Sequence, residues 1–165
     1  YEKPIDERDA EAIFAKDILP FKELIAKEKL LGVMPAHVVY PKVDPNSAGF
    51  SEYWLKQVLR KELGFNGVIF SDDLGMQGAG FAGDYRARAS AALAAGCDMI
   101  LVCNDNAGVM SLLDGFTWPA SAPQYPASLL KPNAAQTAAA LDNTARWENA
   151  KQLAEQICLA QQAKV

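Results

Sequence analysis

Residues 67–76 read Gly-Val-Ile-Phe-Ser-Asp-Asp-Leu-Gly-Met. The run from Val68 to Phe70 is apolar and consists of β-branched and aromatic residues, which is typical of a strand that is buried on both faces. Two carboxylates, Asp72 and Asp73, follow where this run ends. Because parallel α/β proteins hold their ligands in the loops at the carboxyl ends of strands, the pattern favours a catalytic carboxylate at this point.

The two carboxylates are not equivalent candidates. An aspartate at the end of a strand can also cap the next helix or hold a turn through its side chain. If the alternation of the strand continues, Asp72 is the first polar group to leave the sheet. Asp73, Gly75 and Gly78 are instead typical of a turn and the start of a helix. We therefore predict that Asp72 carries the chemistry.

Two further apolar runs predict strands of the same kind. The first begins within residues 30–33 and runs to Tyr40, with its regular part ending near Pro35, because proline cannot donate a hydrogen bond to a sheet. The second spans residues 97–104. Apolar residues at helical spacing predict helices around these strands. The helices are expected at residues 6–28 with a break near Leu19, at 51–63, 85–95 and 107–114, and from about 143 to the end, whereas residues 41–50 and 117–133 are expected to be irregular.

The order of these segments predicts an α/β protein with three βα units and a parallel sheet. Three strands cannot close a barrel, and an open sheet of three would leave two apolar edges in water. We therefore predict that these 165 residues form part of a (β/α)₈ TIM barrel, a fold that typically needs about 250 residues. The chain begins with Tyr1 and not with Met, so we expect it to belong to something longer.

His37 is the only histidine of the chain. It follows the regular part of its predicted strand, as Asp72 follows its own. The carboxyl ends of successive parallel strands share one edge of the sheet, so the two side chains are expected to face a common mouth. A single histidine can equally be a structural group, and the residues alone leave both interpretations open.

Composition and charge exclude several classes of partner. The net charge is −4, and basic residues are mixed with acidic ones, so neither nucleic acid nor an anionic membrane is expected. No apolar run approaches the roughly 20 residues of a membrane-spanning helix. Cys97, Cys103 and Cys158 lack the spacing of a metal site or a redox pair, which indicates a reducing, cytoplasmic location. We predict neither a metal site nor a cofactor.

Several blocks of the sequence are distinctive. They are Gly-Val-Met-Pro-Ala-His-Val-Val-Tyr at 32–40, Val-Asp-Pro-Asn-Ser-Ala-Gly-Phe-Ser at 43–51, the stretch 53–79 that contains the Ser-Asp-Asp motif, and Ala-Gly-Cys-Asp-Met-Ile-Leu-Val-Cys-Asn at 95–104. These blocks resemble the bacterial β-N-acetylglucosaminidases of glycoside hydrolase family 3. The resemblance is specific over residues 30–105 and weaker beyond them.

The resemblance implies a fold and an activity. Residues 1–165 would be the C-terminal part of a single (β/α)₈ barrel domain and carry about its last three βα units. Asp72 would be the nucleophile of a retaining exo-β-N-acetylglucosaminidase and form a covalent glycosyl-enzyme. The implied substrate is the terminal β-1,4-linked N-acetylglucosamine of anhydro-muropeptides, which such enzymes cleave in the bacterial cytoplasm during peptidoglycan recycling.

The resemblance also implies that a catalytic group lies outside this chain. The general acid/base of the family is a histidine paired with an aspartate on a loop after the fifth strand, and that loop precedes Tyr1. His37 belongs to the next strand, where it would bind the sugar or hold its neighbours in place. General acid–base catalysis contributes about 10²- to 10⁴-fold, so we expect activity only together with the N-terminal part of the same barrel.

Two other classes of function are alternatives. A signalling domain would accept a phosphoryl group on a strand-end aspartate with the help of Mg²⁺, and Asp105 is the further carboxylate available for it. The acidic pair and the lysine that complete such sites are not evident. A non-catalytic sugar-binding remnant would use tryptophan side chains as stacking surfaces. Of the three, Trp54 and Trp147 are predicted on apolar helix faces and hence in a core, which leaves Trp118.

Overall fold

The chain forms two units, of which the first ends at Leu130 and the second begins at Lys131. The computed structural model describes residues 4–120, 125, 127–131 and 133–162. Asp72, His37 and the three predicted strands all lie in the first unit.

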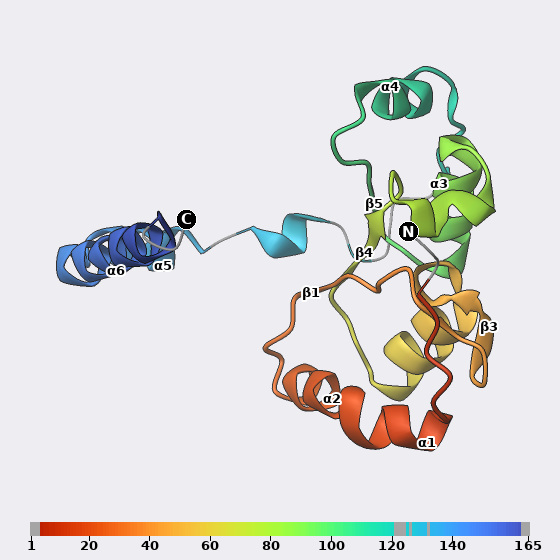
Figure 1. The fold of residues 1–165 in the computed structure, drawn as a ribbon, viewed down its shortest axis with the longest axis horizontal. Coiled ribbons are helices and arrows are strands. Elements are labelled where there is room, and N and C mark those ends of the chain that lie inside the picture. Colours follow the sequence, from red (N-terminus) through yellow and green to blue (C-terminus); the bar gives the residue numbers. More distant parts are fainter. Residues whose placement is uncertain (1–3, 121–124, 126, 132, 163–165) are drawn as a thin grey trace. The chain divides into compact units, whose positions relative to one another are not determined.

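A three-stranded parallel sheet runs through the first unit (Figure 1). Its strands are β1 (Gly32–Val33), β4 (Val68–Asp73) and β5 (Met99–Leu101), in the order β1-β4-β5. The pairing of Gly32 with Val68 and of Phe70 with Met99 sets the register. The prediction of three strands in a parallel sheet is confirmed, although β1 and β5 are shorter than expected and β4 continues through both carboxylates.

Helical segments separate these strands, as predicted. Before β1 the chain forms α1 (Ala10–Ala12), the π-helical turn η1 (Ile13–Asp17) and α2 (Leu19–Ala26). The break falls at Ile18, beside the predicted position, because Pro20 in the first turn of α2 cannot donate a backbone hydrogen bond. The remaining helical segments of this unit are η3 (Tyr53–Glu62), η4 (Gln77–Ala82), α3 (Tyr85–Ala95), α4 (Asn106–Gly115) and η5 (Ala127–Leu130).

Side chains and glycines at the helix ends explain these boundaries. The Ser51 hydroxyl accepts a hydrogen bond from the Trp54 backbone N–H at 3.1 Å, as expected of a residue before a helix. The segment η3 is followed by Gly64, whose φ of 69° is left-handed. The helix α3 likewise ends at Gly96, whose φ is 123°. Both glycines end a helix where the sequence predicts it.

The segment 41–50 differs from its prediction. In place of irregular chain, β2 (Val39–Tyr40) and β3 (Asp44–Ser47) form an antiparallel hairpin, which a 3₁₀ turn, η2 (Ala48–Phe50), follows. Pro45 is tolerated in β3 because this strand pairs with β2 alone among the described strands, so one of its edges needs no donor. The predicted strand up to Tyr40 is therefore two strands in two sheets.

Two apolar clusters hold the first unit together. The larger one joins η3, α3 and α4 to β4, and Ile69 of β4 and Leu74 just after it are fully buried in this cluster. The smaller one joins η1 to η3 through Ile13, Trp54 and Val58. Trp54 is 7% exposed, which confirms its predicted place in the core.

The second unit consists of α5 (Ala134–Leu141) and α6 (Thr144–Gln162). The sequence pattern predicts α6 but not α5. The Asn133 side chain caps α5 by accepting hydrogen bonds from the backbone N–H groups of Ala135 and Gln136. Trp147 is 66% exposed, so its predicted place in a core is wrong. The described part of this unit has two helices and therefore little interior of its own. None of the helices in the described residues is long and apolar enough to cross a membrane.

Candidate active site

Asp72 lies near the carboxyl end of the central strand of the sheet. The residue is partly exposed, and its Oδ1 accepts a hydrogen bond from the Asp73 backbone N–H at 2.9 Å. No partner is found for its Oδ2 among the described residues. The preceding Ser71 is 1% exposed, and its hydroxyl accepts from the Leu101 N–H of β5 at 2.9 Å. The backbone before Asp72 is thereby fixed to the neighbouring strand.

Asp73 has the structural role that the sequence predicts. Its Oδ1 accepts hydrogen bonds from the backbone N–H of Gly75 at 2.8 Å and of Cys103 at 2.9 Å. Its backbone carbonyl accepts from the Met76 N–H at 3.1 Å. These bonds close the turn after β4 and tie it to the chain that follows β5, so the two adjacent aspartates serve different purposes.

His37 lies at the same end of the sheet, as predicted from its position after β1. It is 2% exposed, and its ring stacks on Phe50 with 5.2 Å between the centroids and 9° between the planes. Its Nε2 lies 3.0 Å from the Asp73 carbonyl oxygen. A carbonyl oxygen only accepts, so Nε2 carries the proton and donates it. The predicted contact of His37 with the sugar stays a prediction.

Arg88 anchors the loop between β4 and α3. Its Nη1 donates to the Leu74 carbonyl at 2.6 Å and its Nε to the Gly83 carbonyl at 2.7 Å. The sequence pattern did not single out Arg88 or Ser71. The only signal for Arg88 was an arginine in the first turn of a helix that follows a candidate catalytic loop.

The opposite end of β4 is held by an ion pair. The Asp98 Oδ2 accepts from Arg60 Nη2 at 2.6 Å and from the Ile69 backbone N–H at 2.8 Å. The two side chains are 8% and 18% exposed. Burial lowers the pKa of Arg60, and the charge of Asp98 opposes this shift. The pair thereby holds the amino end of β4, the strand that carries Asp72.

The residues named for the alternative functions have other roles. The Asp105 carboxylate caps α4 by accepting from the Gly108 N–H at 2.9 Å, and it also accepts from the Tyr85 hydroxyl at 2.7 Å. These two bonds lower the pKa of Asp105. Because its carboxylate is already occupied by these hydrogen bonds, Asp105 is not favoured as the further carboxylate of a phosphoacceptor site. Trp118 is 48% exposed and packs edge-on against Phe116.

Enzymes with α/β barrels hold their catalytic residues at the carboxyl ends of parallel strands, which is where Asp72 lies. Residues 1–121 match the glycosyl hydrolase family 3 N terminal domain, and the chain belongs to this family. A β-hexosaminidase of Shewanella frigidimarina is 59% identical over 154 residues, which are 93% of this chain and 45% of that protein. A β-hexosaminidase of Idiomarina loihiensis is 56% identical and covers 90% of this chain and 45% of its own length.

Solved structures of related enzymes resemble the fold. NagZ of Neisseria gonorrhoeae in complex with N-trifluoroacetyl-D-glucosamine is 49% identical, with a TM-score of 0.65 over 73% of this chain and 33% of that one. The β-N-acetylglucosaminidase of Thermotoga maritima is 31% identical, with a TM-score of 0.59 over 69% and 27%. The chain thus spans somewhat less than half the length of its curated relatives and a third or less of these two structures.

Proposed function

We propose that this chain is the C-terminal part of a (β/α)₈ barrel domain of a retaining exo-β-N-acetylglucosaminidase, with Asp72 as the nucleophile. The observation that carries the proposal is the position of Asp72. It stands at the carboxyl end of a buried parallel strand, in a chain of glycoside hydrolase family 3, with one carboxylate oxygen held by a backbone N–H and the other without a partner among the described residues.

The chemistry follows from this arrangement. The unpartnered oxygen of Asp72 attacks the anomeric carbon of the terminal sugar while the glycosidic bond breaks and an acid protonates the leaving oxygen. Water then attacks the same carbon, its proton passes to the base, and Asp72 is released. Two displacements at one carbon retain the configuration. The acid/base pair, a histidine and an aspartate, comes from the part of the barrel that precedes this chain.

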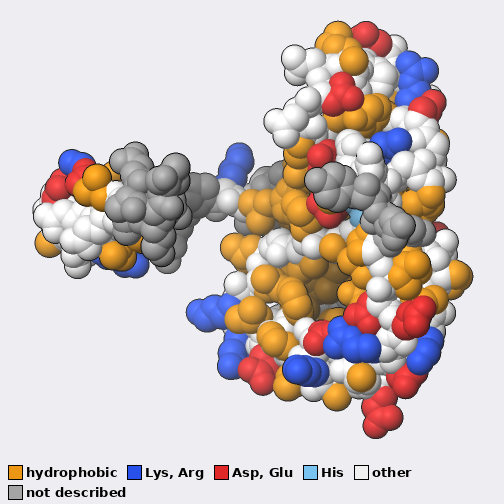
Figure 2. All heavy atoms as spheres, in the orientation of Figure 1, with side chains coloured by type: hydrophobic (Ala, Val, Ile, Leu, Met, Phe, Trp, Pro, Cys, Tyr) orange, Lys and Arg blue, Asp and Glu red, His pale blue; other side chains and the backbone are white. Residues whose placement is uncertain are grey.

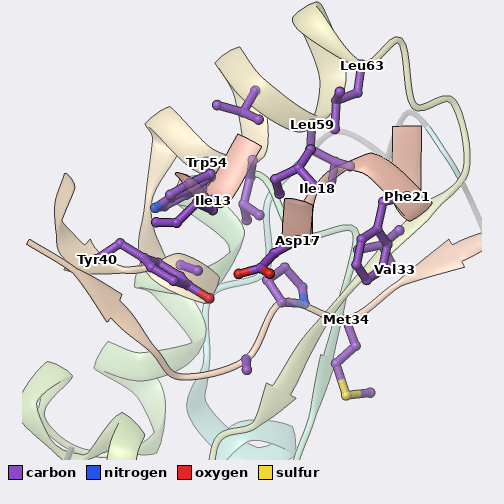
Figure 3. A pocket seen from close by; sticks show the side chains of 15 residues that line it. Ile13, Asp17, Ile18, Phe21, Val33, Met34, Tyr40, Trp54, Leu59 and Leu63 are labelled. Carbon is purple, nitrogen blue, oxygen red and sulfur yellow. The ribbon is translucent and has the colours of Figure 1, made fainter. Parts of the chain in front are cut away.

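The sheet has two edges with which strands of the preceding part could pair. Among the described strands β1 pairs only with β4 and β5 only with β4, so each of the two keeps an edge that a barrel would use. An apolar pocket of about 290 Å³ opens beside β1, where Val33 and the side chains Ile13, Phe21 and Leu59 of the flanking helical segments line it (Figure 3). Figure 2 shows hydrophobic side chains around a hollow in this unit. Further βα units of a barrel would cover such surface.

The substrate we propose is the terminal β-1,4-linked N-acetylglucosamine of anhydro-muropeptides, which would be released in the bacterial cytoplasm during peptidoglycan recycling. Cell-wall biogenesis, cell shape and cell division are the processes served. Support comes from the β-hexosaminidase relatives and from NagZ of N. gonorrhoeae, whose structure holds an N-acylated glucosamine.

Replacement of Asp72 tests the proposal. In the complete enzyme, meaning this chain together with the preceding part of the barrel, Asp72→Ala is expected to lower the release of N-acetylglucosamine by at least about 10³-fold, because the alanine side chain cannot form the covalent bond. Asp114→Ala is the matched control, since Asp114 is exposed and lies on α4. It is expected to keep full activity. Undiminished turnover by Asp72→Ala would refute the assignment.

A further inference from the structure

His37 is connected to Asp72 through the backbone of Asp73. Its Nε2–H donates to the Asp73 carbonyl oxygen at 3.0 Å, and the N–H of the same residue donates to the Asp72 Oδ1 at 2.9 Å. The two peptide groups that flank the Asp73 α-carbon are therefore fixed, one by His37 and one by the Asp72 side chain itself. A displacement of the 73–74 peptide group would shift the Asp73 α-carbon and, with it, the N–H that holds the Asp72 carboxylate.

The ring of His37 is held firmly enough to act as such a fixed point. It is 2% exposed and stacks on Phe50. A β-carbon placed on Gly78 would come within 3.0 Å of the His37 β-carbon, and one placed on Gly49 within 3.8 Å of Nδ1. The imidazole is thus enclosed between η2 and η4. A side chain that is locked by packing can hold a catalytic group in one geometry.

The hydrogen bonds of the His37 ring show which of its two nitrogens holds the turn after Asp72. The Asp73 carbonyl already accepts from the Met76 N–H, and His37 supplies its second donor. The Nδ1 atom is buried and has no hydrogen-bond partner among the described residues. Only Nε2 links the imidazole to the turn that follows the nucleophile.

We infer that His37 is a positioning residue, which holds the Asp73 peptide and through it the carboxylate of Asp72 in the orientation for attack. This inference rests on the proposed function and takes one of the two roles that the sequence leaves open for His37. It requires no contact between His37 and the sugar. A misplacement of about 1 Å in a reacting group can cost about 10²-fold in rate, so His37 should affect the formation of the covalent bond and not the affinity for the sugar.

Replacement of His37 by glutamine or by asparagine distinguishes the role of Nε2 from that of Nδ1, because both new side chains end in the same amide group. In His37→Gln the side-chain N–H₂ reaches about the place of Nε2, whereas in His37→Asn it reaches only about the place of Nδ1. In the complete enzyme we expect His37→Asn to slow covalent labelling of the nucleophile by a ring-fluorinated, activated N-acetylglucosamine about 10- to 100-fold. The inhibition constant of free N-acetylglucosamine should stay within about twofold, and His37→Gln should restore most of the labelling rate.

Three results would overturn the inference. Weaker inhibition by N-acetylglucosamine in both variants would show that His37 contacts the sugar. A labelling rate equal to that of the wild type in His37→Asn would show that the hydrogen bond has no effect on the nucleophile. A parallel fall in melting temperature and rate in both variants, with no rescue by glutamine, would show a merely structural role. Asp72→Ala in the same series tests the proposed function separately, since it should abolish labelling whatever His37 does.

Discussion

Single residues at the two ends of β4 determine where Asp72 stands. At the carboxyl end, Asp73 uses its carboxylate for the turn, which leaves the carboxylate of Asp72 available for chemistry. At the amino end, the Asp98 and Arg60 pair ties the strand to its neighbours. The position of the proposed nucleophile thus depends on the hydrogen bonds of neighbouring residues at both ends of β4.

Removal of the charge of Asp98 tests how much the ion pair at the amino end of β4 contributes to stability. In Asp98→Asn the buried Arg60 loses its anionic partner, so we expect the complete enzyme to lose roughly 2 to 4 kcal/mol of stability. Urea unfolding followed by tryptophan fluorescence measures the loss. Asp114→Asn removes an exposed carboxylate and should change the stability by less than about 0.5 kcal/mol. Equal midpoints for the two variants would show that the ion pair contributes nothing.

At the scale of elements, the sequence predicts best where local chemistry decides. Ser51, Gly64 and Gly96 mark helix ends, and the structure places helix ends beside them. The hairpin of β2 and β3 was missed, because Pro45 and Asn46 are typical of loops and the pairing of Val39 with Ser47 is not local. The helix α5 was missed because its apolar residues are mostly alanine, which shows little periodicity.

Gly64 and Gly96, which each end a helix, allow a matched comparison of the stability lost on replacement by alanine. Both have positive φ, but a β-carbon on Gly64 meets nothing within 4 Å, whereas one on Gly96 comes within 3.3 Å of Lys56 Cγ and 3.4 Å of Leu55 Cβ. We expect Gly64→Ala to cost about 1 kcal/mol, from backbone strain alone, and Gly96→Ala about 2 to 3 kcal/mol. Chemical denaturation of the complete enzyme measures both. A cost for Gly64→Ala equal to or above that of Gly96→Ala would contradict this account of the two turns.

At the scale of the whole molecule, each of β1 and β5 has an edge that no other described strand pairs with, which agrees with a sheet that continues in other chain segments. The sequence predicted this from three apolar strands that could not close a barrel. It also predicted that His37 and Asp72 share one end of the sheet. The hydrogen bond from His37 to Asp73 was beyond sequence reasoning, because it depends on how residues 36 positions apart in the chain meet.

If this chain is part of a barrel, as we propose, these residues do not act alone. They carry the proposed nucleophile, whereas the proposed acid/base pair lies in the preceding part of the barrel, and they would contribute only some of the contacts to the sugar. The chain by itself should therefore release no N-acetylglucosamine above background, since it lacks the acid that assists departure of the leaving group. Supply of the preceding part, for example from the S. frigidimarina relative, should restore turnover.

The most direct test of the account is to find which residue forms the covalent bond to the sugar. The complete enzyme and this chain alone are incubated with an N-acetylglucosamine derivative that carries a ring fluorine and a fluoride leaving group, and peptide mass spectrometry then locates the adduct. We predict one glycosyl adduct on Asp72 in the complete enzyme and none in the chain alone. An adduct on any other residue, Asp73 included, would contradict the central claim.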